Sequence, residues 1–305
     1  MGSSPISGTK MEGMKRENFF GILSGSVKVM FVSFTFLFSI ILFPLLFMPS
    51  AGEILSVGKA RWVQMVTSFV TFVVPVVAFE LCFSPNILES LSLSTRPQKK
   101  MLGFFALCML LILPTISLLE EWNRMANSYI LTIPQRDWIL RLEERADASL
   151  SVLLTCHSLW DIVCIFFVVA VCAGFCEEVL FRGFLQNRLE RILGGPHWAI
   201  WISAVLFSLI HFQFNGFIPR MIMGVFLGYS LVWGRSLWIP IVLHIINNSI
   251  AVTLKILFDK NILDSKWNSF FWEDHPVEVM LPLFLCIGLI YWKARRKRIP
   301  KMENR

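Results

Sequence analysis

Long uninterrupted apolar runs constrain this chain more than any other feature of its sequence. Runs of about 17 to 25 residues are long enough to cross the hydrocarbon core of a bilayer as α-helices. Hydrophobic residues make up 55% of the 305 residues and charged residues only 16%, whereas a soluble domain carries roughly 25% charged residues. The sequence therefore predicts an all-α polytopic membrane helix bundle, and it excludes a soluble nucleic-acid-binding protein.

The apolar runs predict about eight transmembrane helices. They lie near residues 27–48, 62–83, 101–119, 158–191, 197–212, 217–234, 237–258 and 277–292. Between the third and fourth runs, charges alternate with spaced Trp, Ile and Leu, which is typical of an amphipathic interfacial segment. The expected organisation is a tail over 1–26, three transmembrane helices over 27–119, an interfacial segment over 120–157, a four-helix core over 158–258, and a last helix with a basic tail over 259–305.

The distribution of charge predicts the orientation of the chain. The net charge is +7, and the basic clusters fall on alternate loops and in the C-terminal tail. By the positive-inside rule, both termini are expected in the cytoplasm. The lipid bilayer is therefore an expected partner, nucleic acid is not, and the oligomeric state is left open.

Ionisable side chains inside membrane helices are costly and usually functional. Glu80, Asp161 and Lys255 lie toward the ends of their segments, where we expect the side chains to reach the membrane interface. The remaining ionisable residues fall in the predicted core, and two amides accompany them. They are Glu177, Glu178, Arg182, His211, His244, Asn247 and Asn248.

The segment CEEVLFR places three of these residues close together on one helix. Glu178 and Arg182 are four residues apart and can form an ion pair on one face. Glu177 points about a third of a turn away and has no such partner, which suits a general base. The structural alternative is an ion-pair cluster that only joins helices.

His211 and His244 are expected near Glu177. The sequence Gly194-Gly195-Pro196 ends one helix and starts the next. Glu177 precedes this turn by about seventeen residues and His211 follows it by about sixteen, so an antiparallel hairpin brings them to similar depth. His244 shares one face of its helix with Asn248. We therefore expect a polar site in a dry bundle; hydrogen-bonded packing between helices is the alternative.

Three motifs in this order resemble the CPBP family of intramembrane proteases, also called the Abi family, which includes the CAAX prenyl endopeptidases. They are EExxxR at Glu177 to Arg182, FxxxH at Phe207 to His211, and HxxxN at His244 to Asn248. The resemblance covers roughly residues 155–257, and its surroundings resemble prokaryotic members. It implies a multi-pass protein of a prokaryotic cytoplasmic membrane.

The resemblance implies an intramembrane endopeptidase that cuts a membrane-anchored or lipidated, CAAX-like protein substrate, including a prenylated one. On the matching positions, Glu177 would activate the attacking water and His211 would hold or polarise it. These are parts that peptide hydrolysis requires.

The resemblance also implies roles for the remaining motif residues. His244 and Asn248 would donate hydrogen bonds to the developing oxyanion, where preorganised donors contribute most. Glu178 and Arg182 would be supporting residues that fix the helix and orient the base.

Metal dependence stays undecided at this stage. Glu177, His211 and His244 would also form a set of two histidines and one carboxylate suited to a hydrolytic zinc ion. The metal-independent interpretation is favoured because Asn248 and the second Glu fit an oxyanion scheme. A non-catalytic immunity or regulatory partner of the same fold is the alternative function. A proton-coupled transporter is a third, but no internal repeat supports it.

Overall fold

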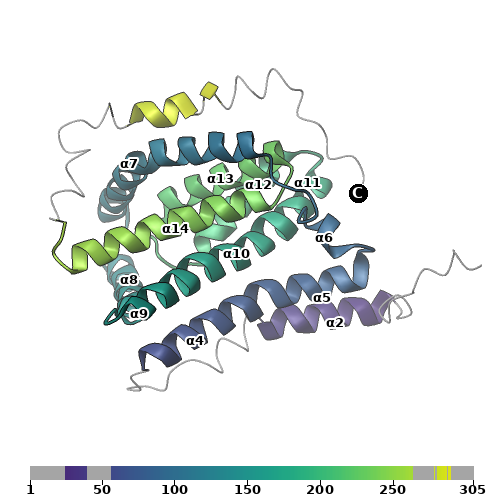
Figure 1. Ribbon diagram of the computed structural model, residues 1–305, viewed down its shortest axis with the longest axis horizontal. Helices are drawn as coiled ribbons and strands as arrows, with labels where there is room; N and C mark the ends of the chain where they lie inside the picture. The colour runs from purple at the N-terminus through teal and green to yellow at the C-terminus, as the bar shows by residue number, and fades with distance from the viewer. Residues whose placement is uncertain (1–24, 40–55, 264–277, 279, 287, 290–305) are drawn as a thin grey trace, which may run out of the picture.

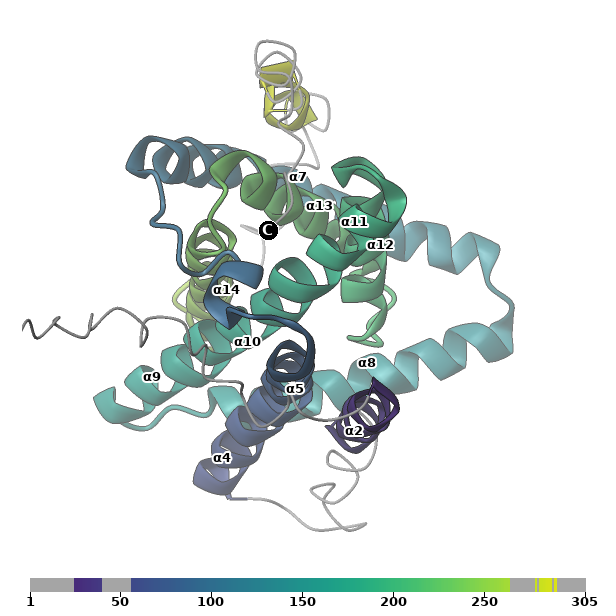
Figure 2. The same cartoon turned by 90° about the vertical axis from the view of Figure 1, so that its right-hand side faces the viewer.

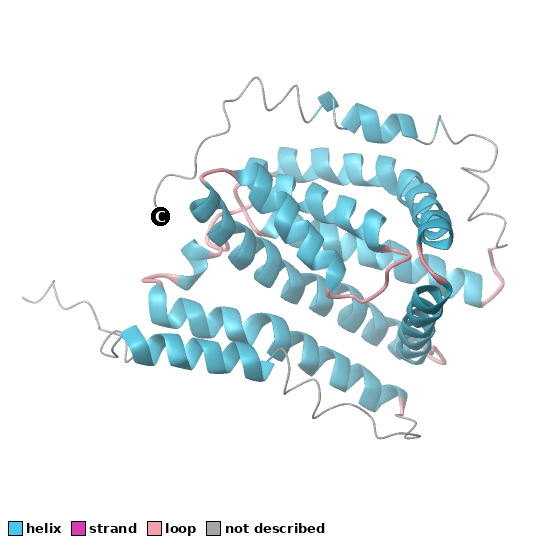
Figure 3. Cartoon of the chain, turned by 180° about the vertical axis from the view of Figure 1, so that it is seen from behind, coloured by secondary structure: helices cyan, strands magenta, loops and turns pink. Residues whose placement is uncertain are grey.

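The computed structural model describes residues 25–39, 56–263, 278, 280–286 and 288–289 as a bundle of helices (Figure 1). In this part of the chain every regular element is helical, as Figure 3 shows. Five helices are long and apolar enough to cross a membrane. They are Val57–Phe83, Lys99–Ile130, Leu159–Leu193, Phe217–Gly234 and Trp238–Asp259. The predicted all-α membrane bundle is confirmed, and the chain is a multi-pass membrane protein.

The predicted number of eight spans is not confirmed. One predicted span, 197–212, is a shorter apolar helix in the structure, Pro196–Leu209. Of the first predicted span, 27–48, the structure describes residues 27–39, which include the apolar helix Val27–Leu37, and residues 40–48 lie outside the described part. The predicted last span, 277–292, lies largely outside the described residues.

The elements follow one another without strands between them in the described residues. In chain order they are α2 (Gly25–Leu37), α4 (Val57–Ser68), the π-helical η2 (Phe69–Val73), α5 (Val74–Phe83), α6 (Ile87–Ser90), α7 (Lys99–Ile130), α8 (Ile133–Leu154), α9 (Leu159–Ile165), η3 (Phe166–Cys172), α10 (Ala173–Glu178), η4 (Val179–Gln186), α11 (Asn187–Leu193), α12 (Pro196–Leu209), α13 (Phe217–Gly234) and α14 (Trp238–Asp259). The elements from α9 to α11 run on as one span.

The α9–α11 span lies at the centre of the bundle (Figure 1). Helix α14 packs against its first half and α12 against its second half, while α4 and α5 lie on another side and α2 lies along α5. Helix α13 packs against α12, α14 and α7. Apolar side chains fill the space between these helices. Phe105, Met109, Leu227 and Leu243 are among those that are fully buried.

The turn between α11 and α12 forms as the sequence predicts. Gly194 adopts a left-handed conformation with φ 71° at the end of α11, a conformation that costs glycine nothing because it has no Cβ. Pro196 then occupies the first turn of α12, where its missing N–H is no loss. This turn makes α11 and α12 antiparallel neighbours, and α12 also packs against η4. The end of α12 therefore lies in the same part of the bundle as Glu177.

The helix that contains the third predicted span does not end at residue 119. Helix α7 continues to Ile130, and α8 occupies Ile133–Leu154. Residues 120–130 contain neither glycine nor proline, so nothing in their sequence breaks the helix. The segment predicted as interfacial is therefore the end of α7 together with α8, which Figure 2 shows reaching out to one side of the bundle.

Two ionisable residues near the ends of the predicted spans, Glu80 and Asp161, are paired between helices. Glu80 is fully buried, and Arg188 donates to it at 2.6 Å. Asp161 accepts from Arg61 at 2.7 Å, and Arg61 also donates to the carbonyl of Leu153. Burial of an ionised group requires such a partner. These pairs therefore join α5 to α11 and α4 to α9, and Arg61 also binds the end of α8.

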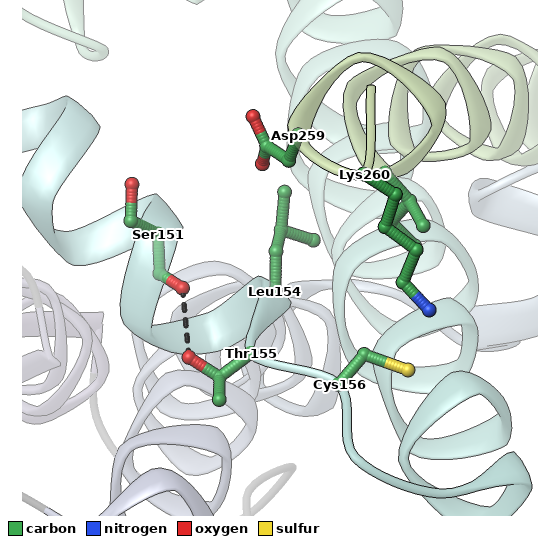
Figure 4. A pocket seen from close by; sticks show the side chains of 7 residues that line it. Ser151, Leu154, Thr155, Cys156, Asp259 and Lys260 are labelled. Atoms are coloured by element: carbon green, nitrogen blue, oxygen red, sulfur yellow. Dashed lines mark hydrogen bonds between the residues drawn. The ribbon is translucent and has the colours of Figure 1, made fainter. Parts of the chain in front are cut away.

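A pocket of about 190 Å3 opens between the end of α8 and the end of α14 (Figure 4). It is lined by Ser151, Leu154, Thr155, Cys156, Ile256, Asp259 and Lys260. Asp259 lies fifteen residues after His244, roughly 22 Å along the helix. None of the predicted site residues lines this pocket.

Candidate active site

A buried ion pair forms the base of the candidate site. Glu178 is the last residue of α10, and Arg182 follows one turn later in η4. Nη1 of Arg182 donates to Oε1 of Glu178 at 2.6 Å, and Nη2 donates to the carbonyl oxygen of Gly224 on α13 at 3.1 Å. Both side chains are almost fully enclosed. The predicted intrahelical pair is therefore present, and it also ties α13 to the central span.

His244 joins this pair from α14. Its Nδ1 lies 2.7 Å from Oε1 of Glu178, the oxygen that also accepts from Arg182. A carboxylate oxygen can only accept, so Nδ1 carries the proton of this hydrogen bond. Nε2 is therefore a lone-pair acceptor in the neutral ring and a donor only in the imidazolium. Glu178 thus fixes which nitrogen of His244 is available for chemistry.

Glu177 faces the available nitrogen. Its Oε2 lies 3.7 Å from Nε2 of His244, and 12% of its side chain is exposed, against none of Glu178. Glu177 takes part in no hydrogen bond through its carboxylate among the described residues. It is therefore the accessible member of the carboxylate pair, whereas Glu178 is fully committed to Arg182 and His244.

His211 lies two residues beyond Leu209, the last residue of α12, so this helix ends before the predicted limit at residue 212. Its Nδ1 donates to the carbonyl of Phe207 at 2.8 Å. Because a carbonyl oxygen only accepts, Nδ1 carries the proton and Nε2 is free to accept. Nε2 has no hydrogen-bond partner in the part of the chain that the structure describes.

The ring of Phe207 contacts one residue of each of the three sequence motifs. It packs edge-on against His211 at 5.0 Å between ring centroids and against His244 at 5.8 Å. The guanidinium of Arg182 lies over the same ring, with Cζ 4.5 Å from its centroid. Such cation–π and edge-to-face contacts fix the orientation of aromatic groups. The Phe of the FxxxH motif therefore connects the two other motifs.

The structure gathers Glu177, Glu178, Arg182 and His244 by direct contacts and His211 through Phe207. No hydrogen bond or ion pair joins Glu177 to His211 directly. Glu177 and His211 share two neighbours, because the charges of His244 and Arg182 act on both of them. This agrees with the similar depth that the hairpin predicts for Glu177 and His211.

The two amides of α14 lie one turn beyond His244. Nδ2 of Asn248 donates to the carbonyl of Val169 on the central span at 3.3 Å, and Nδ2 of Asn247 donates to Oδ1 of Asn248 at 3.3 Å. Asn248 is thus the amide that points toward the central span. The structure does not bring it into contact with Glu177 or His244, and one of its amide hydrogens has no described partner.

Arg220 is a site residue that the sequence interpretation missed. It lies in the first turn of α13, and its guanidinium donates to the backbone and side-chain oxygens of Gln213 at 3.3 and 2.8 Å. Its charge acts on both Glu177 and His211. The signal was an arginine inside an apolar span, which is the same signal that singled out Arg182.

Glu177, His211 and His244 are the residues that the sequence offers as metal ligands. Among the described residues, no group of three His, Cys, Asp or Glu side chains is arranged to hold a metal ion. The set of Glu177, His211 and His244 does not fit a metal ion as arranged.

Comparisons with known proteins match the part of the chain that holds this site. Residues 158–250 match the family model described as type II CAAX prenyl endopeptidase Rce1-like. Over 97 residues the chain is 30% identical to "Membrane-embedded CAAX protease MroQ" of Staphylococcus aureus (strain USA300), a match that covers 30% of this chain and 39% of the relative. No solved structure matches the chain significantly. All four predicted catalytic residues lie within the segment that matches the family.

Proposed function

Because this chain belongs through residues 158–250 to the CPBP family of CAAX proteases, we propose that it is an intramembrane endopeptidase. Its reaction is the hydrolysis of a peptide bond with a water that Glu177 activates. The observation that carries this proposal is the position of Glu177, a partly exposed carboxylate that lies 3.7 Å from Nε2 of a buried histidine.

Glu177 acts as the general base. It takes a proton from the attacking water and later gives that proton to the leaving amine, so that its carboxylate is regenerated. Nε2 of His211 accepts a hydrogen bond from the same water and holds it, since Nδ1 of that ring is occupied by Phe207. Arg220 places a positive charge beside both groups.

The oxyanion of the tetrahedral intermediate takes its hydrogen bonds from His244 and Asn248. Nε2 of His244 donates to the oxyanion when the ring is the imidazolium, while Nδ1 keeps its hydrogen bond to Glu178. Asn248 contributes the amide hydrogen that Val169 leaves free. Donors that are fixed before the reaction stabilise the developing charge most. Arg182 and Glu178 hold His244 in this orientation.

The proposed substrate is a membrane-anchored or lipidated protein of CAAX type, cut near the cytoplasmic face. A substrate held in the bilayer reaches a site on membrane helices by lateral diffusion, and its lipid or apolar anchor supplies binding energy. The expected location is a prokaryotic cytoplasmic membrane with both chain termini in the cytoplasm. The comparisons match proteases, so the non-catalytic alternative receives no support from them.

The test is proteolysis by the purified full chain in liposomes. Quenched fluorescent peptides are offered in matched pairs, with and without a lipid tail, and mass spectrometry identifies the bond that is cut. We expect cleavage of the lipidated member of a pair at a lower KM than the free peptide. Equal cleavage of both would contradict the proposed substrate class, and no cleavage of any pair would contradict the proposed activity.

A further inference from the structure

The loop that carries His211 is held by residues from outside the segment that matches the family. Residues 210–216 connect α12 to α13, and three side chains of α7 and α8 bind this loop. We propose that Asn123, Asn127 and Glu143 are positioning residues for His211. This inference rests on the proposed function and extends the catalytic unit to the α7–α8 hairpin.

Asn123 contributes the innermost contacts. It lies on α7 and is 4% exposed. Its Nδ2 donates to the carbonyl of Phe214 at 2.6 Å, and its Oδ1 accepts from the backbone N–H of Ile218 at 3.3 Å. One side chain thereby joins the middle of the loop to the first turn of α13, whose N–H groups have no partner within the helix.

Asn127 and Glu143 bind the next residue of the loop. Nδ2 of Asn127, one turn beyond Asn123, lies 3.2 Å from the Phe214 carbonyl and donates to Oδ1 of Asn215 at 3.0 Å. From α8, Oε1 of Glu143 accepts from the backbone N–H of Asn215 at 2.9 Å. Side chains of α7 and α8 therefore form hydrogen bonds with polar groups of the loop. The family match does not include these two helices.

The loop needs this support because its backbone is strained beside His211. Phe212 has φ 52°, in the left-handed region that a bulky residue adopts only when its surroundings hold it there. The orientation of the His211 ring depends on this backbone, because a single hydrogen bond, to Phe207, holds the ring itself. Loss of the contacts to Phe214 and Asn215 would release the turn and let the ring of His211 move.

The opposite side of the loop is also bonded, but by groups of the matched segment. Oγ of Ser208 donates to the carbonyl of Phe217 at 2.7 Å and closes the loop, and Arg220 holds Gln213. These contacts fix the ends of the loop and Gln213. The carbonyl of Phe214 also accepts from the backbone N–H of Phe217 at 3.3 Å. The side-chain hydrogen bonds to Phe214 and Asn215 come from α7 and α8, so the two sets of contacts are complementary.

The test compares three substitutions on α8 in the full chain in liposomes. Glu143→Met removes the acceptor for Asn215, Glu143→Gln keeps an acceptor without the charge, and Glu144→Met changes an exposed neighbour. We expect Glu143→Met to lower kcat by about 10- to 100-fold with little change in KM, because misplacement of a catalytic group costs about that much. Glu143→Gln should restore most of kcat, and Glu144→Met should match the wild type.

A second readout does not depend on proteolysis. In protein labelled with 15N at histidine, His211 is assigned by its loss in His211→Asn, and we expect one tautomer with the proton on Nδ1. Glu143→Met should give averaged signals for this ring. Unchanged His211 signals together with unchanged kcat in folded Glu143→Met would overturn the positioning role. Absence of proteolysis in the wild type, with averaged signals in Glu143→Met, would overturn the proposed function and leave the positioning role supported.

Discussion

Nε2 of His244 and Oε2 of Glu177 lie 3.7 Å apart, while Nδ1 of the same ring is bonded to Glu178 at 2.7 Å. The distance between Nε2 and Oε2 is longer than a hydrogen bond, but one water molecule beside these two atoms could form a hydrogen bond with each of them. The two adjacent carboxylates therefore have different tasks. Glu178 orients the imidazole, and Glu177 remains available to react.

Removal of Arg182 should strongly destabilise the protein. Arg182→Met would leave the fully buried carboxylate of Glu178 without its cation, which costs about 3–5 kcal/mol in measured cases. Lys255→Met is the matched control, because the Lys255–Asp259 pair is about half exposed and such pairs contribute at most about 1 kcal/mol. Thermal unfolding in detergent measures both. Equal losses in the two variants would contradict the structural role of the buried pair.

Chelation should not abolish proteolysis. As arranged, Glu177, His211 and His244 do not form a group of three ligands, and the proposed water is activated by a carboxylate. Activity is measured after dialysis against a strong chelator and again after zinc is added back. We expect unchanged kcat in both samples. Loss on chelation with recovery on zinc addition would contradict the proposed mechanism and favour a metal site.

Close approach of α12 and α13 depends on Gly228. A Cβ at this position would lie 2.8 Å from Cγ2 of Ile200 and from Oε1 of Gln186, so Gly228→Ala should cost about 1–3 kcal/mol by overpacking. Gly103→Ala on α7 is the control, because nothing lies within 4 Å of its Cβ position. That change should stabilise the helix by about 0.5–1 kcal/mol.

Each of the two glycine variants adds one methyl group to the wild type. Because the added group is the same, the opposite effects expected on stability test the contact between α12 and α13 directly. Thermal unfolding of both variants in the same detergent should give a lower Tm than the wild type for Gly228→Ala and a higher Tm for Gly103→Ala. A Tm for Gly228→Ala at or above that of the wild type would show that α12 and α13 do not approach so closely.

Local spacing in the sequence predicted the parts of the site that lie on one helix or one hairpin. Glu178 and Arg182 pair as their separation of four requires. Gly194 and Pro196 form the expected turn. These features depend only on residues close in the chain, whose geometry in a helix is fixed.

Contacts between distant helices could not be predicted in the same way. The hydrogen bond from His244 to Glu178 and the hydrogen bond from Asn248 to Val169 depend on how α14 is rotated against the central span. Hydrophobic runs do not report this rotation, because lipid-facing and buried faces are equally apolar. Asn123 and Glu143 bind a loop, where no periodic pattern marks the partner.

The most direct test of the central claim is the rate of peptide cleavage by Glu177→Gln in liposomes, beside Glu89→Gln at an exposed position outside the site. The substitution keeps the shape of the side chain and removes its basicity. We predict a loss of at least about 100-fold in kcat with an unchanged Tm, and wild-type activity for Glu89→Gln. Wild-type kcat in folded Glu177→Gln would contradict the role of Glu177 as the base.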